Sequence, residues 1–75
     1  MIQDQLVVGQ LYQIDEDVQG TYVGYNKEDQ GIYFMPQGNS GGYFLSTTPG
    51  FKGCIGFYSA GHLLGDFTIV QQQSK

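Results

Sequence analysis

The sequence contains no arginine and no tryptophan, and it has few charged residues of either sign. Its basic side chains are Lys27, Lys52 and Lys75, against seven carboxylates, and the formal net charge is −4. Proteins that bind nucleic acid use Lys and Arg to displace the counterions of the phosphates, and anionic membranes attract basic segments in the same way. The composition therefore argues against both nucleic acid and a membrane as partners.

A single cysteine, Cys54, excludes an intramolecular disulfide, whereas small secreted domains usually carry several. The first residues, 1–5, lack the basic and apolar regions of a signal peptide. No apolar run reaches the length of a membrane-spanning helix. We therefore expect a soluble protein in a reducing, cytoplasmic setting, which is the host cytoplasm if a phage encodes it.

Uninterrupted helix-forming stretches are also scarce, because 12 glycines are spread along the 75 residues and Gly costs about 1 kcal/mol relative to Ala inside a helix. The apolar residues fall into short β-rich bursts bounded by Gly, Asn, Asp and Pro, which is typical of strands. The pattern predicts one all-β, antiparallel domain with little helix, a helical turn within 59–65, and frayed ends at 1–5 and 71–75. The expected five to six strands are 7–14, 21–25, 32–35, 43–46, 54–58 and 67–70.

A short motif, Gly-x-Tyr followed by Val or Phe, occurs three times, at 20–23, 31–34 and 41–44. Copies this short favour an antiparallel meander over a solenoid. If Tyr22 faces Tyr33, the connecting turn is Asn26–Asp29, and if Tyr33 faces Tyr43, the next turn centres on Gly38. Both positions carry residues that favour turns, so the motif predicts two hairpins.

This register assigns two faces, because side chains alternate along a strand. The predicted core face carries Val23, Tyr25, Ile32, Phe34 and Phe44. The opposite face carries a tyrosine row flanked by two apolar residues, which are Tyr22, Tyr33, Tyr43, Met35 and Leu45. Tyr and Met are enriched at the centres of interfaces, so one interpretation is a binding surface. The other is a second core layer, covered by the C-terminal strand or by the loop before it.

The segment VGQLYQI at 8–14, the acidic loop after it and GTYVGY at 20–25 resemble the opening of an SH3-like barrel of the KOW or Tudor type. In this resemblance, which extends over about residues 6–70, 32–35 is the next strand and 67–70 the closing strand. It implies a small, strongly bent β-barrel. Signalling SH3 domains bind proline-rich peptides through a tryptophan that is missing here, so that activity is not carried over. The chain also departs from KOW domains, which are usually basic.

Three other features offer no catalytic residue, metal site or cofactor. The run Asp15-Glu16-Asp17 lacks the spaced oxygen ligands of a calcium loop and is expected to be a solvated turn. Cys54 and His62 alone are too few for a zinc site, and nothing around them matches a nucleophilic pair. The glycine-rich stretch 38–42 lacks the lysine of a phosphate-binding loop.

The sequence therefore favours a non-enzymatic protein-binding module, for instance a small regulator or inhibitor that docks on a larger protein, as many phage proteins do. The acidic run would steer a basic partner surface. The expected partner-binding residues are Tyr22, Tyr33, Tyr43, Met35, Leu45, Asp15, Glu16 and Asp17. Two alternatives stay open: a structural subunit that forms a homo-oligomer through its aromatic face, and a nucleic-acid binder that relies on aromatic stacking.

Overall fold

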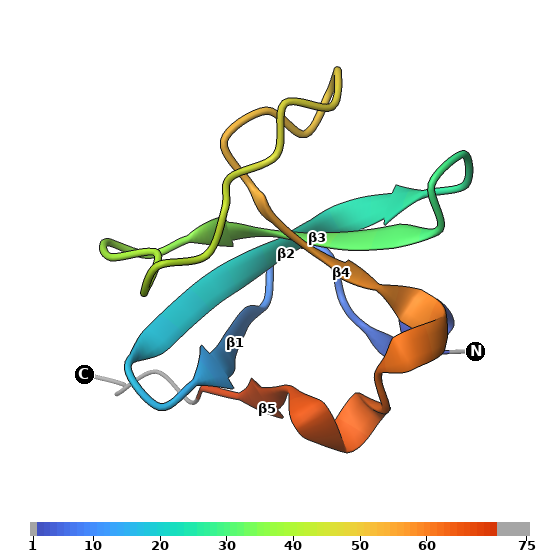
Figure 1. Cartoon of the computed structure of the whole chain (residues 1–75). Helices are drawn as coiled ribbons and strands as arrows, with labels where there is room; N and C mark the ends of the chain where they lie inside the picture. Colours follow the sequence, from blue (N-terminus) through green and yellow to red (C-terminus); the bar gives the residue numbers. More distant parts are fainter. Residues whose placement is uncertain (1, 71–75) are drawn as a thin grey trace.

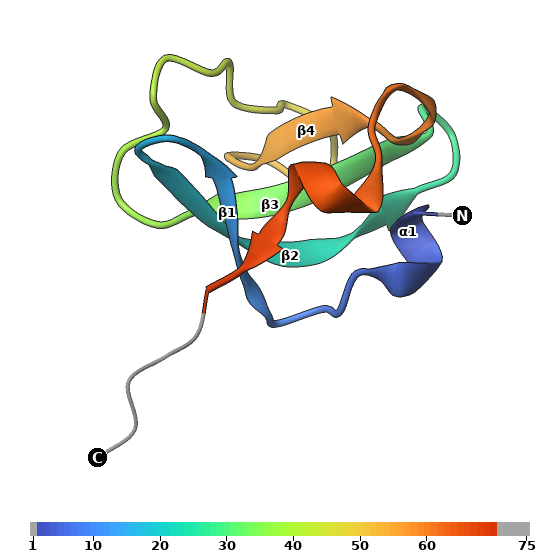
Figure 2. The ribbon, with the colours of Figure 1, turned by 90° about the horizontal axis from the view of Figure 1, so that it is seen from below.

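Five antiparallel strands form one bent sheet in the computed structural model, which describes residues 2–70. The strands are β1 (Leu11–Asp15), β2 (Val18–Asn26), β3 (Gly31–Pro36), β4 (Ile55–Tyr58) and β5 (Thr68–Ile69). Their order is β4-β3-β2-β1-β5, and Figures 1 and 2 show the sheet bending so that β5 and β1 lie across the core from β3 and β4. The predicted all-β antiparallel fold of five to six strands is confirmed.

Helical structure is limited to three short turns within residues 2–70. These are α1 (Ile2–Gln5) and the 3₁₀ turns η1 (Ser59–Gly61) and η2 (Leu64–Asp66). In place of the single helical turn expected within 59–65, around His62, Leu63 and Leu64, there are two 3₁₀ turns with His62 and Leu63 between them. Of residues 1–5, which were expected to fray, Ile2–Gln5 form α1, and Ile2 packs against the core. Residue 1 and the expected frayed end at 71–75 lie outside the described residues. No helix among the described residues is both long and apolar enough to cross a membrane.

The core lies inside the bend of the sheet and is largely aromatic. Phe34 of β3 is at its centre, with ring centroids 5.8 Å from Tyr12 and 5.0 Å from Phe67. The cluster of buried residues consists of Leu6, Tyr12, Tyr22, Ile32, Phe34 and Phe67. Strands β1, β2 and β3 thus each contribute an aromatic side chain to one interior.

A β-bulge in β2 overturns the predicted register. Tyr22 pairs with Phe34 and Gly24 with Tyr33, so Val23 is an extra residue on β2. A bulge of this kind shifts the pairing by one residue, which moves side chains to the opposite face. Tyr22 therefore points into the core, whereas Tyr33 lies on the outer face. The prediction of three tyrosines side by side is wrong, and the hairpin loop is 27–30 rather than Asn26–Asp29.

Residues 37–54 leave the sheet, so the hairpin predicted near Gly38 and the strand predicted at 43–46 are wrong. Gly41 has a φ of +64°, and a Cβ at this position would lie 2.2 Å from Cγ2 of Val18. An L-residue avoids this conformation, and an extended strand does not contain it. Leu45 forms one isolated antiparallel bridge with Ile55, and β3 pairs with β4 instead. Phe44, predicted in the core, is 97% exposed.

Candidate functional site

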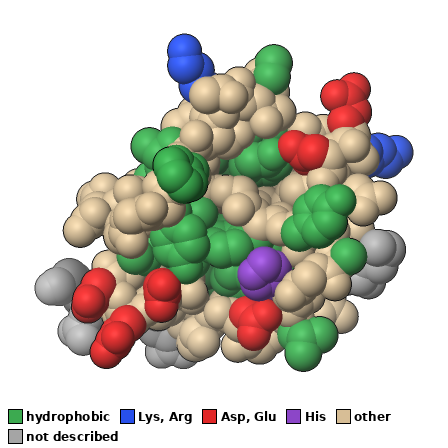
Figure 3. Space-filling view, in the orientation of Figure 1, with side chains coloured by type: hydrophobic (Ala, Val, Ile, Leu, Met, Phe, Trp, Pro, Cys, Tyr) green, Lys and Arg blue, Asp and Glu red, His purple; other side chains and the backbone are tan. Residues whose placement is uncertain are grey.

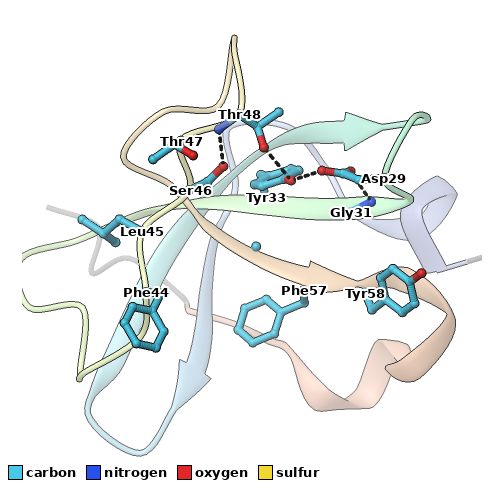
Figure 4. Close-up of a pocket in the computed structure, with 11 residues that line it drawn as sticks. Asp29, Gly31, Tyr33, Phe44, Leu45, Ser46, Thr47, Thr48, Phe57 and Tyr58 are labelled. Atoms are coloured by element: carbon cyan, nitrogen blue, oxygen red, sulfur yellow. Dashed lines mark hydrogen bonds between the residues drawn. The ribbon is translucent and has the colours of Figure 1, made fainter.

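A groove of about 430 Å³ lies on the outer side of the sheet, between β4 and the segment 44–48. Figure 4 shows Phe44 and Leu45 on one side of it and Phe57 and Tyr58 along β4 on the other. Figure 3 shows hydrophobic side chains gathered on this face of the molecule, with acidic side chains around them. The groove combines apolar walls with an aromatic floor.

The floor of the groove is the ring of Tyr33, which lies flat on two glycines. A Cβ on Gly56, the residue opposite Tyr33 on β4, would lie 2.7 Å from the tyrosine ring, and a Cβ on Gly31 would lie 2.9 Å from it. The ring of Phe51 stacks on Tyr33 at a centroid distance of 4.5 Å and an angle of 19°. Tyr33 is buried by these contacts, so the floor is held rigidly before any partner arrives.

One end of the groove carries an oriented carboxylate, Asp29. Its Oδ1 accepts the Gly31 amide at 3.0 Å, and its Oδ2 accepts a hydrogen bond from the Tyr33 hydroxyl. Thr48 Oγ1 lies 3.5 Å from the same hydroxyl. Asp29 is nevertheless exposed, and each carboxylate oxygen can accept more than one hydrogen bond. No lysine of the described chain lines the groove, so this end presents a negative charge.

The walls of the groove are apolar side chains that face water. Phe44 is 97% exposed, Tyr58 63% and Leu45 47%. Single apolar residues on a surface need no explanation, whereas a group of them around a concavity is typical of interaction sites. The alternating pattern of β4 places Tyr58 and Gly56 on the face opposite Ile55, which is buried.

The structure separates most of the residues predicted to bind a partner. Tyr22 is 2% exposed and belongs to the core, so no partner can reach it. Tyr33 and Leu45 both line the groove, and these two are brought together. Met35 is exposed on β3 outside the groove lining. Asp15 ends β1, Glu16 and Asp17 form the turn to β2, and all three are exposed.

Tyr43 joins the acidic turn instead of a tyrosine row. Its hydroxyl donates to Asp15 Oδ2 at 2.9 Å, and its ring lies edge-on to Phe57 at 5.5 Å. The Glu16 amide and, to a lesser extent, this hydroxyl hold the pKa of Asp15 below its usual value. Burial and the bond to Asp15 raise the pKa of Tyr43. Tyr43 therefore anchors the 37–54 segment to the β1–β2 turn.

We expect Tyr43→Phe to raise the pKa of Asp15, because the charged carboxylate loses one hydrogen-bond donor. A carboxyl with a lowered folded-state pKa adds stability above its unfolded pKa, and this stability is lost as the pH falls through the folded pKa. The variant should therefore lose slightly less stability than the parent upon acidification. An NMR titration of the Asp15 carboxyl measures the shift. Tyr58→Phe is the control, and an unchanged Asp15 pKa in Tyr43→Phe would refute the contact.

Of the groove residues that sequence reasoning missed, Phe44, Tyr58, Gly56 and Asp29 matter most to its shape and charge. The motif placed Phe44 in the core, and Asp29 was read only as part of a turn. The alternation of 54–58 could have separated Tyr58 from Ile55, because the two positions differ in parity. Nothing local could have placed Gly56 opposite Tyr33, since that pairing joins segments 23 residues apart.

Cys54 is buried in the protein, and the ring of His62 packs against aromatic side chains. Cys54 is buried, and burial raises the pKa of its thiol, so the thiol stays protonated near neutral pH. The ring of His62 packs on Phe57 and Phe67 at 5.0 and 5.7 Å. In the described chain, no three His, Cys, Asp or Glu side chains are grouped to hold a metal ion.

Comparisons with known proteins leave the groove as the main guide to function. No protein-family model, curated protein or solved structure matches the chain. The function is therefore argued from the groove and from the strand beside it.

Proposed function

We propose that the protein is a non-enzymatic binding module whose groove beside β4 receives a partner protein. The observation that carries this proposal is the gathering of Phe44, Leu45 and Tyr58, all exposed, around a rigid floor. Large aromatic side chains at such positions supply most of the energy at protein interfaces. A floor that is already ordered lowers the entropy cost of binding.

A protein fits this groove better than a small molecule does. Small-molecule sites usually enclose most of the ligand surface, whereas the side chain of Phe44 stands almost wholly in water. Such a side chain gains apolar burial only if the partner itself covers it. The partner must therefore extend beyond the groove and over its walls.

The wider role that we propose is a small regulator or inhibitor that docks on a larger protein in the cytoplasm, of the kind that phages encode. An SH3-like barrel remains the proposed fold family. The pairing of the first strand with the last in a bent sheet supports it.

The test is affinity capture from the source cell with the parent protein and with Phe44→Ala and Tyr58→Ala. Truncation of a central aromatic anchor costs about 2 kcal/mol or more, which corresponds to about thirtyfold in affinity. We therefore expect the partner to be lost from both variants. Val8→Ala is the matched control, because Val8 is exposed but lies outside the groove.

Two outcomes would contradict the proposal. If both groove variants stay folded and capture the same protein as the parent does, the groove is not the binding surface. If gel filtration shows that the parent is a stable oligomer which Phe44→Ala dissociates, the groove is an interface between copies of the chain. Circular dichroism and a thermal melt of each variant establish that the fold is intact.

A further inference from the structure

The outer edge of β4 leaves part of its backbone uncovered. In an antiparallel strand, the N–H and C=O groups of alternate residues point to opposite edges. The Cys54 carbonyl accepts the Ser46 amide at 2.7 Å, on the side away from β3, and the Ser59 amide donates to Gln30 on the side of β3. The same alternation directs the backbone groups of Gly56 and Tyr58 away from β3.

The segment 43–46 runs beside this edge but pairs with it only at Leu45, among the described residues. Leu45 makes a single bridge to Ile55. Beyond it, neither the Gly56 carbonyl nor the Tyr58 amide has a hydrogen-bond partner within residues 2–70. Both residues are exposed. The Tyr58 carbonyl lies 2.9 Å from His62 Nδ1. This contact occupies the carbonyl, so the open part of the edge ends at Tyr58.

One acceptor and one donor therefore face the fork between β4 and the departing 43–46 segment. An open edge of this kind is a template for another strand. An incoming antiparallel strand can donate an amide to the Gly56 carbonyl and accept the Tyr58 amide, and a parallel strand can do so with a single residue. The groove lies in this fork, since Phe44 and Leu45 line it on one side and β4 on the other.

We propose that the occupant of the groove is an extended, basic segment of a partner protein that adds to β4 as a further strand. The inference rests on the proposed function and names the form of the partner. Strand addition combines backbone hydrogen bonds with pockets for alternate side chains. Here one side chain of the segment enters the groove between Phe44 and Tyr58, and a Lys or Arg faces the Asp29 carboxylate.

The negative charge of the protein favours a basic segment over a second copy of this chain as the occupant of the groove. Two copies would each bring a net charge of −4, and no lysine of the described chain lines the groove to compensate Asp29. Like charges placed together at an interface oppose association. A basic segment instead gains attraction from the whole molecule and a charge-assisted hydrogen bond at Asp29.

The backbone at Tyr58 is compatible with proline, which has no amide hydrogen. Its φ is −73°, which lies within the range that proline imposes, and the residue before it is in an extended strand, as proline prefers. Tyr58→Pro deletes the amide donor and the side chain, whereas Tyr58→Ala deletes only the side chain. The difference between the two variants therefore reports on access to the edge of β4 at the Tyr58 amide.

The probe is an array of peptides about eight residues long, the length of a short strand, in which Val, Ile or Phe alternates with Lys or Thr. A matched array carries Glu in place of Lys. We expect the parent to bind the basic array and not the acidic one. We expect Tyr58→Pro to bind about tenfold more weakly than Tyr58→Ala, because the peptide carbonyl loses its donor.

Hydrogen exchange followed by NMR gives an independent readout. The Tyr58 amide should exchange fast in the free protein and become protected when a basic peptide binds. The Phe57 amide, which faces β3, is the internal control and should be protected in both states.

Equal binding by Tyr58→Pro and Tyr58→Ala would overturn strand addition, as would binding that is equal on both arrays or absent from the basic one. None of these results touches the capture experiment with Phe44→Ala. A partner lost from both Phe44→Ala and Tyr58→Ala, together with peptide binding that is equal in Tyr58→Pro and Tyr58→Ala, would mean that the groove binds a protein by other contacts.

Discussion

Phe34→Ala is expected to lower the free energy of unfolding by about 3–5 kcal/mol. The side chain is fully buried and contacts the rings of Tyr12, Tyr22 and Phe67 at centroid distances of 5.8, 5.4 and 5.0 Å. Alanine would leave a cavity between β1, β2 and β3, and these paired strands cannot move inward to fill it. A domain of this size is stabilised by only about 5–10 kcal/mol, so the loss is a large part of the total. Urea denaturation measures it.

Phe44→Ala is the matched control, because the same side chain is removed from a position that is 97% exposed. We expect its stability to be within about 0.5 kcal/mol of the parent. Comparable losses in the two variants would mean that Phe44 is part of the core, as the repeated motif first indicated, and that the described groove is wrong.

Gly20→Ala is expected to destabilise the protein by about 1–3 kcal/mol. Gly20 pairs with Tyr12 on β1 and with Pro36 on β3. It therefore lies in the part of β2 that is hydrogen-bonded to a strand on each side. A Cβ would lie 2.9 Å from the Cβ of Phe34 and 3.2 Å from the carbonyl oxygen of Met35. Neither atom can move without its strand, so the sheet itself must shift. A thermal melt would show the loss.

Gly65→Ala is the control for this substitution. A Cβ at Gly65 meets nothing within 4 Å, and its φ is not in the left-handed range. Alanine there should be neutral or slightly stabilising, because it reduces the entropy of the unfolded chain. A Gly20→Ala variant as stable as Gly65→Ala would show that the strands have room to separate at the bend.

The candidate site could be predicted only in part. Tyr33 and Leu45 were expected at a binding surface and do line the groove, but Tyr22 was expected beside them and lies in the core. The bulge at Val23 separates Tyr22 from Tyr33. A bulge adds a single residue and has no sequence signal as strong as a turn, so a register derived from equal spacing fails at that point.

The sequence by itself determined the class of fold and the approximate position of one hairpin turn. Twelve glycines and short β-rich bursts exclude long helices, and the Asn-Lys-Glu-Asp segment predicted a hairpin turn within one residue of the observed loop, 27–30. The charge balance also limits the partners, because it depends on composition and not on folding.

Only the tertiary structure decided which copy of the repeated motif became core. Residues 31–34 and 41–44 share the pattern Gly-x-Tyr-Phe, yet Phe34 is 0% exposed and Phe44 97%. Strand β3 has a partner on each side, β2 and β4, whereas within residues 2–70 the segment 41–44 pairs with no strand and the adjacent Leu45 makes one isolated bridge. Local pattern sets the tendency to form a strand, but burial depends on which distant segments pair with it. That pairing placed one phenylalanine at the centre of the core and left the other on the wall of the groove.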